Sequence, residues 1–143
     1  MSHANIKIVQ DAYAAFGRGD IPALLTLLAD DVSWGMVGRP EDFPAAGIKQ
    51  GKAGVAEFFR QLKDAQQITH FEPQRLLAAD DTVVAIGHAG WIMNKSGITG
   101  ENDWVHVFTF RDGKVATYRG HQDTGLLAAA YHAQPVTRRV AGA

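Results

Sequence analysis

The sequence predicts a single α+β domain in which helices cover one face of a curved, mostly antiparallel sheet. Apolar residues recur at helical spacings of three and four in the first half of the chain, whereas from residue 68 onward they alternate with a period of two. An Asp112-Gly113 pair between two alternating segments is a strong hairpin signal. Helices followed by a run of strands are typical of the α+β class. The length of 143 residues suits one domain with one core, over residues 1–143.

Helices are predicted at four places. The first covers residues 5–16 and carries one apolar stripe. Asp20 is a suitable N-cap for a short second helix over residues 23–28. A third helix is expected over residues 52–65, and a short closing helix over 124–131. The stripe of the first helix consists of Ile6, Val9, Tyr13 and Phe16.

Four strands follow the third helix in the predicted order. They cover residues 68–79, 82–93, 103–110 and 114–123. Pro73 has no backbone N–H to contribute to a sheet, so its strand is expected at an edge or with a bulge at this point. Successive strands joined by short turns form an antiparallel meander.

Between the helices lies a segment rich in proline and glycine. Residues 32–34 begin an extended stretch, and residues 35–51 have no regular period, which predicts a loop over the body of the domain. Met36 and Phe43 are candidate walls of a pocket beneath this loop. The alternative is a loop that only packs its own apolar residues. The tail, residues 134–143, is expected to be flexible.

The last hairpin sets a register that gathers polar side chains. If Asp112-Gly113 is a two-residue loop, Arg111 lies opposite Lys114, and directly opposed residues share one face of the sheet. Further pairs are then expected as follows: Phe110 with Val115, Phe108 with Thr117, His106 with Arg119, Trp104 with His121, and Asn102 with Asp123. This face is apolar near the turn and ionisable at its far end.

The far end of that face contains the candidate catalytic residues. A carboxylate partly buried among aromatic rings tends to have a raised pKa, which would suit Asp123 as a general base with His121 orienting it. His106 and Arg119 would stabilise a developing enolate oxygen. Two structural alternatives remain open: Asp123 could be the N-cap of the final helix, and His106 with Arg119 could be an internal polar pair without chemistry.

Aromatic and apolar residues around these groups are the candidate ligand-binding wall. Their flat rings would suit a small, apolar, ring-shaped molecule. The set comprises Trp104, Trp34, Tyr13, Phe16, Met36, Phe43, Asn102 and Phe108.

Composition and spacing argue against several other functions. The net charge is −1 and basic residues are scattered, so no nucleic-acid or membrane surface is expected. The chain has no cysteine, and its histidines lack metal-ligand spacing along the sequence, so no metal is expected. No Gly-rich phosphate loop follows a strand, and no cofactor is expected. A cytoplasmic protein is the default expectation.

Three segments together resemble the NTF2-like superfamily: residues 13–31, residues 51–59, and residues 107–123 with the run Val107-Phe108-Thr109-Phe110-Arg111-Asp112-Gly113. The chain is most similar to the SnoaL-like polyketide cyclases and ketosteroid-isomerase-related proteins. The resemblance implies a cone-shaped α+β barrel around a hydrophobic pocket, commonly paired as a homodimer through the outer face of the sheet.

The resemblance also bears on single residues. Asp123 stands where SnoaL-like cyclases have their aspartate base, and His106 where ketosteroid isomerase has its oxyanion-hole acid. Ala12 and Met36 stand near that isomerase's tyrosine and base, which departs from its pattern. Gly87 and Ala89 stand where limonene-epoxide-hydrolase relatives need an arginine and an aspartate, so a hydrolase is the less favoured reaction.

Two classes of function follow from the sequence. The first is a metal-free SnoaL-like enzyme, an isomerase or cyclase, that acts by acid/base chemistry on a small apolar, cyclic or polyketide-like molecule. The second is a module without catalysis that binds a hydrophobic ligand or serves as an interaction scaffold.

Overall fold

The computed structural model describes residues 2–135 and consists of helices packed on one side of a six-stranded sheet. Residues 136–143, most of the tail predicted to be flexible, lie outside the described residues. The helices are α1 (Ser2–Gly17), α2 (Ile21–Leu25), α3 (Gly51–Ala65) and α4 (Thr124–His132). The strands are β1 (Leu28–Met36), β2 (Gly47–Gln50), β3 (Gln66–Ala79), β4 (Thr82–Met93), β5 (Thr99–Arg111) and β6 (Lys114–Gln122).

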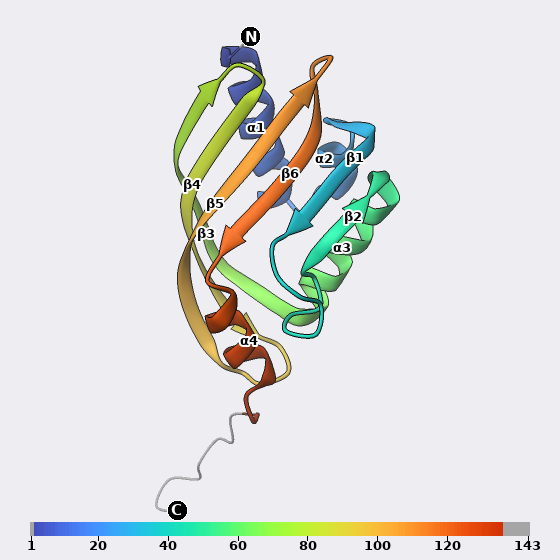
Figure 1. The fold of residues 1–143 in the computed structure, drawn as a ribbon. Helices are drawn as coiled ribbons and strands as arrows, with labels where there is room; N and C mark the ends of the chain where they lie inside the picture. Colours follow the sequence, from blue (N-terminus) through green and yellow to red (C-terminus); the bar gives the residue numbers. More distant parts are fainter. Residues whose placement is uncertain (1, 136–143) are drawn as a thin grey trace, which may run out of the picture.

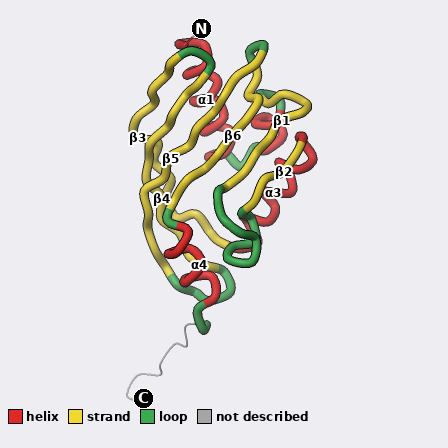
Figure 2. The backbone as a smooth tube through the Cα atoms, viewed as in Figure 1, coloured by secondary structure: helices red, strands yellow, loops and turns green. Residues whose placement is uncertain are grey.

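The sheet is mixed, with the strand order β2-β1-β6-β5-β4-β3. Only the β1–β6 pair is parallel, and the other neighbours are antiparallel. Figure 1 shows the sheet curving around α1, α2 and α3, while α4 continues from the end of β6. Figure 2 shows how long strands dominate the half of the chain that follows α3. The predicted α+β class and NTF2-like fold are therefore confirmed.

The structure differs from the predicted elements near the first strand. α2 ends at Leu25, and β1 begins at Leu28, inside the segment predicted as helical. Leu28 pairs with Val115 of β6 and is almost fully buried, so tertiary pairing overrides the helical preference of a short leucine-rich stretch. The predicted loop over residues 35–51 contains strand β2, which pairs with β1.

Two local predictions are confirmed. Asp20 is the N-cap of α2, because its carboxylate accepts a hydrogen bond from the backbone N–H of Ala23 at 3.1 Å. Pro73 lies in β3, which is an edge strand, and the register with β4 shifts between Pro73 and Arg75. The missing N–H of proline explains why the ladder is interrupted there.

The register of the last hairpin is only partly as predicted. Arg111 pairs with Lys114 and Phe110 with Val115, around a turn in which Asp112 and Gly113 both have positive φ. Ala116 is then an extra residue in β6, and beyond it every pair is shifted by one. The observed pairs are Thr109 with Thr117, Phe108 with Tyr118, Val107 with Arg119, His106 with Gly120, Val105 with His121, and Trp104 with Gln122.

This shift makes the predicted polar face wrong. A one-residue slip moves each side chain to the opposite face of a sheet. The pairs predicted for Phe108, His106 and Trp104 are not formed, and β6 ends at Gln122, so Asp123 has no partner in Asn102. Tyr118, Gly120 and Gln122 occupy the helix-covered face in place of Thr117, Arg119 and His121.

A glycine in the centre of the sheet makes room for a large ring. Gly87 pairs with Trp104, and a Cβ atom at Gly87 would lie 2.2 Å from Cζ2 of the indole and 2.5 Å from the carbonyl oxygen of Glu72. The indole of Trp104 therefore lies flat across β4 toward Phe71 of β3, on which it stacks at 4.8 Å between ring centroids. This arrangement builds a flat aromatic floor on the helix-covered face.

The core fills the space between this face and the helices. Its largest fully buried apolar side chains come from both layers: Val9, Leu28, Val32, Val55, Val83, Met93, Phe108 and Val115. No helix in the described part of the chain is both long and apolar enough to cross a membrane.

Candidate active site

A cavity of about 80 Å³ lies between the sheet and the helices α1 to α3. That volume corresponds to the space that roughly three water molecules take up in the liquid. Its wall is dominated by aromatic rings, and the lining residues are Ala12, Tyr13, Phe16, Leu24, Trp34, Met36, Phe58, Phe59, Leu62, Gln66, Ile68, Phe71, Ala89, Trp91, Trp104, His106, Phe108, Tyr118 and Gln122.

Three titratable side chains line the cavity, namely Tyr13, His106 and Tyr118. No Asp, Glu, Lys or Arg among the described residues does so. The site is therefore apolar with a few hydrogen-bonding groups, which is the usual character of small-molecule pockets.

Tyr13 and His106 form a hydrogen-bonded pair in the wall of the cavity. The hydroxyl of Tyr13, on α1, lies 2.8 Å from Nδ1 of His106, on β5. Burial raises the pKa of Tyr13, with a smaller contribution from Tyr118, so the hydroxyl keeps its proton. Burial lowers the pKa of His106 to about 3, with a smaller contribution from His121, so the imidazole is neutral near pH 7. Two neutral groups share this bond.

The ring of His106 is fixed by its neighbours. It stacks on Trp104 with 4.0 Å between centroids and 16° between planes, and the Tyr118 ring meets it edge-on at 5.0 Å. Opposite His106 in the sheet is Gly120, and a Cβ atom there would lie 2.5 Å from the Tyr118 hydroxyl. The glycine thus allows the Tyr118 hydroxyl to lie beside the imidazole. Burial also raises the pKa of Tyr118, which keeps it a proton donor.

Several buried polar atoms of the lining residues have no hydrogen-bond partner within the described protein. These are Nε1 of Trp34, Nε1 of Trp104 and Oε1 of Gln66. By contrast, Nε1 of Trp91 donates to Oδ1 of Asn102 at 2.7 Å. Unsatisfied buried polar atoms are uncommon in proteins and are often found at functional sites.

Most of the predicted ligand-binding residues do line the cavity. Trp104, Trp34, Tyr13, Phe16, Met36 and Phe108 are all part of its wall, together with His106. Asn102 is not: it is buried on the same face as Ala89, its partner in β4, and its Oδ1 accepts a hydrogen bond from the indole of Trp91. Phe43 is buried elsewhere and packs edge-on against Tyr131 at 5.8 Å.

Three of the four predicted catalytic residues lie outside the cavity wall. Arg119 faces away from it, and its guanidinium donates to the backbone oxygens of Ser33 and Tyr118 and to Oγ of Ser33. His121, opposite Val105, is exposed. The extra residue at Ala116 is the physical reason, because it turns both side chains outward.

Asp123 is the N-cap of α4. Its exposed carboxylate accepts a hydrogen bond from the backbone N–H of Leu126 at 3.0 Å, the geometry of the alternative left open by the sequence. The single patch predicted for Asp123, His106, Arg119 and His121 is therefore not formed. Catalytic roles for Asp123, Arg119 and His121 stay predictions that have to be tested by substitution.

Sequence reasoning missed several residues of the wall. Phe58 and Phe59 both line the cavity from α3, and neither is among the wall residues predicted from the sequence. The predicted register places Tyr118 on the opposite face. The residue at the bulge is Ala116, and an alanine, unlike a glycine or a proline, gives no sign of a bulge. Phe71, Gln66 and Gln122 could have been predicted as wall residues because they share one face of the sheet with Trp104 and Ala89. That shared face is known only once the strand registers are known.

Metal-ligating groups are scarce in the cavity and present elsewhere. His106 is the single imidazole among the described lining residues and has no carboxylate beside it there. His70, His88 and Glu101 approach one another on the outer face of the sheet, away from the cavity.

The sequence and the fold are similar to those of known proteins. The model of the SnoaL-like domain matches residues 9–118. An NTF2-like protein from Burkholderia xenovorans LB400 is 33% identical, with a TM-score of 0.83 over 92% of this chain and 98% of that one. TerC, in a structure co-crystallised with polyporic acid, is 26% identical, with a TM-score of 0.78 over 91% and 99%.

A proposed polyketide cyclase from Xanthomonas campestris pv. campestris shares the fold, at 22% identity and a TM-score of 0.74 over 91% and 98% of the two chains. Among curated proteins, no match to this chain is found.

Proposed function

Because this chain belongs to the SnoaL-like family, we propose that it is an enzyme that moves a proton on a small, cyclic, largely apolar carbonyl compound. Tyr13 and His106 are the proposed acid/base pair, and Tyr118 is the proposed donor to the carbonyl oxygen. The observation that carries the proposal is the 2.8 Å hydrogen bond between the Tyr13 hydroxyl and Nδ1 of His106 in the wall of an aromatic cavity.

The pair has two tautomers that suit the two halves of a proton transfer. When Nδ1–H donates to the Tyr13 oxygen, Nε2 has a free lone pair and can accept a proton from the carbon next to the carbonyl. When Tyr13 donates to Nδ1, Nε2 carries the hydrogen and can donate. An isomerisation would return the abstracted proton to another carbon, so no further reactant is needed.

The low pKa of His106 fits this role only with a bound substrate. A neutral imidazole buried among rings is a weak base, because burial disfavours the imidazolium. An enolate formed beside it would supply the opposite charge and stabilise the imidazolium. Tyr118 lines the cavity beside the imidazole, and its hydroxyl would stabilise the enolate oxygen.

The wall favours a flat and uncharged ligand. Trp34 stacks on Tyr118 at 4.0 Å, and Trp104 stacks on His106 at the same distance, so two ring pairs contribute to the cavity wall. The lining contains no ionic side chain among the described residues that would pair with a charged ligand. Co-crystallisation of TerC with polyporic acid supports an organic small molecule as the ligand class.

A second candidate function is ligand binding without chemistry. The absence of any carboxylate or lysine from the described lining favours it, since these side chains are frequent general bases. It predicts that cyclic ketones bind without losing their α-protons.

Proton exchange in D₂O tests both candidates. A panel beginning with cyclohexanone and 2-cyclohexenone is incubated with the protein, and deuterium uptake next to the carbonyl is followed by NMR. Tyr13→Phe and His106→Gln should each lower the exchange rate by about 100-fold or more, the usual range for acid/base groups. Tyr131→Phe, a tyrosine outside the cavity wall, is the matched control.

Binding of a ketone without exchange, unchanged by Tyr13→Phe, would establish the second function instead. If Asp123→Asn abolishes exchange and His106→Gln does not, the general base is Asp123, as expected from the sequence.

A further inference from the structure

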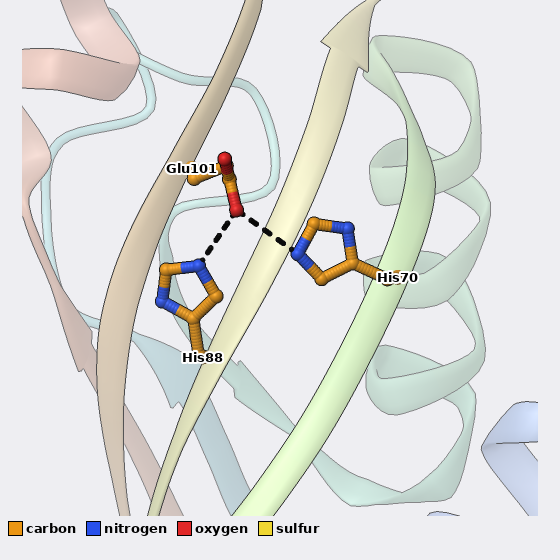
Figure 3. Close-up of side chains that lie close together, drawn as sticks. All are labelled: His70, His88 and Glu101. Carbon is orange, nitrogen blue, oxygen red and sulfur yellow. Dashed lines mark hydrogen bonds and ion pairs between the residues drawn. The ribbon is translucent and has the colours of Figure 1, made fainter.

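Two histidines and a glutamate meet on the outer face of the sheet (Figure 3). Nε2 of His88 lies 2.9 Å from Oε1 of Glu101, and Nε2 of His70 lies 3.1 Å from the same oxygen. The three ligand atoms are all within 4.8 Å of one another. They come from three neighbouring strands, β3, β4 and β5.

The strand registers explain why these groups converge. Gly90 of β4 pairs with His70 on one side and Glu101 on the other, so a residue without a side chain separates them. A Cβ atom at Gly90 would lie 2.2 Å from Cε1 of His70, so the imidazole lies flat over the glycine and reaches toward Glu101. His88 lies two residues before Gly90 and thus faces the same side. Its ring stacks on that of His70 at 5.6 Å.

The arrangement leaves one oxygen between two imidazole nitrogens. A carboxylate oxygen cannot donate, so each of these contacts needs either a proton on the nitrogen or a cation between the atoms. Two imidazoles with one carboxylate are a common ligand set for Zn²⁺ and related divalent ions, with bonds of about 2.0–2.2 Å. Such bonds place ligand atoms roughly 3.3 Å apart in a tetrahedral site. The two observed N···O distances are close to that spacing.

A further carboxylate supports His88 from behind. Nδ1 of His88 lies 2.9 Å from Oδ1 of Asp103, which fixes the ring so that Nε2 is directed at Glu101. Metal-ligating histidines usually donate their other N–H to such a carboxylate, which sets the tautomer and raises the basicity of the ligand nitrogen.

We propose that His70, His88 and Glu101 bind a divalent transition-metal ion of the Zn²⁺ type, with Asp103 as the positioning residue of His88. Water would complete the coordination, since the cluster is open to solvent. On binding, the ion replaces any proton held between the imidazole nitrogens and Glu101. Bound there, it joins the edge strand β3 to β4 and β5.

Metal titration of the full chain, purified without a polyhistidine tag, tests this site. Isothermal titration with Zn²⁺ should give one ion per chain, and Co²⁺ should give the visible absorption of a low-coordinate site. His70→Gln and Glu101→Gln should each abolish the saturable uptake of Zn²⁺. Glu101→Gln keeps a side chain that can hydrogen-bond to the histidines, so its effect would report the loss of a metal ligand. Asp103→Asn should weaken the affinity by about 10–100-fold, the usual effect of such a supporting group.

His121→Gln is the matched control, because His121 is an exposed histidine in a neighbouring part of the same face. It should bind Zn²⁺ like the natural protein. All four variants change partly or fully exposed side chains, and circular dichroism checks that they fold. Zinc should also raise the Tm of the natural chain but not that of His70→Gln. Uptake that survives both His70→Gln and Glu101→Gln, or no saturable uptake by the natural chain, would show that the cluster is only a hydrogen-bonded ion pair.

Discussion

The hydroxyl of Tyr13 and Nδ1 of His106 lie 2.8 Å apart, and this contact links the helix α1 to the centre of the sheet in the wall of an apolar cavity. It is the one hydrogen bond that the imidazole makes with the described residues. Because each group is partly buried and would otherwise lack a partner among the described residues, the contact affects the stability of the fold as well as the chemistry proposed for the site.

Removing the Tyr13 hydroxyl should therefore destabilise the protein even without substrate. Tyr13→Phe keeps the ring and its packing but leaves Nδ1 of His106 unsatisfied, which costs about 1–3 kcal/mol. Urea unfolding measures the free energy of unfolding, with Tyr131→Phe as the comparison. Equal stability of the two variants would mean that the Tyr13–His106 bond contributes nothing to folding.

The buried His106 should make stability depend on acid pH. Its pKa is lowered to about 3 in the folded protein, whereas an unfolded chain has the ordinary value of about 6.5. Between these values the unfolded state binds more protons, so stability falls as the pH is lowered from about 6.5 toward 3. The slope from this group is at most about 1.4 kcal/mol per pH unit.

The difference between the natural chain and His106→Gln isolates this effect from that of the carboxylates. Urea unfolding at a series of pH values should show a shallower loss of stability in the variant below about pH 6.5. Parallel curves for the two proteins would contradict a neutral, buried His106.

Gly87 should not tolerate even one added methyl group. Gly87→Ala would bring Cβ within 2.2 Å of the Trp104 ring and 2.5 Å of the backbone oxygen of Glu72, so the aromatic floor has to shift. Overpacking of this kind costs about 1–3 kcal/mol. Gly17→Ala, where nothing lies within 4 Å, is the control and should be neutral or stabilising by up to about 1 kcal/mol. Urea midpoints compare the two, and similar midpoints would contradict the packing argument.

Substitutions of Asp123 should separate capping from catalysis. Asparagine is as good an N-cap as aspartate, so Asp123→Asn should keep the stability of the protein, while Asp123→Ala should lose about 1 kcal/mol. Thermal unfolding of both variants tests the cap. Proton exchange on a cyclic ketone tests catalysis, because a loss of exchange in Asp123→Asn at unchanged stability would assign chemistry to this carboxylate.

The end of the outer face near the Asp80-Asp81 and Asp112-Gly113 turns, beyond the cluster of His70, His88 and Glu101, should hold a second copy of the chain. Arg75, Ile86, Val105 and His121 form one row across four strands, and Leu77, Val84, Val107 and Arg119 form the next. Leu77 and Val105 are 44% and 37% exposed, which leaves apolar surface in contact with solvent. Light scattering should show a dimer that Val105→Glu converts to a monomer and that Gln10→Glu, on the exposed side of α1, leaves intact. If light scattering shows that the natural chain is a monomer, the proposed dimer is wrong.

Much of the fold could be predicted because it depends on periodicity. Helical spacings before residue 66 and strand alternation after it are visible in the sequence, and Asp112-Gly113 correctly located the last hairpin turn. The short strand β2 was missed, since a four-residue strand among glycines and prolines has no detectable period.

The site was predicted less well because it depends on register. One unpaired residue, Ala116, reverses the faces of Arg119 and His121 relative to His106, and alanine carries no sign of a bulge. The aromatic wall around Trp104 was still largely identified, since β5 itself keeps its alternation. No metal site was expected, because spacing along the chain does not reveal ligands that meet across three strands.

The two edges of the sheet determine how copies of this protein can meet. β2, at one edge, is only four residues long, and β3, at the other, has Pro73 and two register shifts along its length. A long, regular edge strand would invite another chain to add to the sheet through backbone hydrogen bonds, which leads to open-ended aggregation. Here one edge is too short and the other too irregular for such growth. The shape of β3 thus disfavours growth along the edges and leaves the flat outer face of the sheet as the surface on which the proposed second copy would pack.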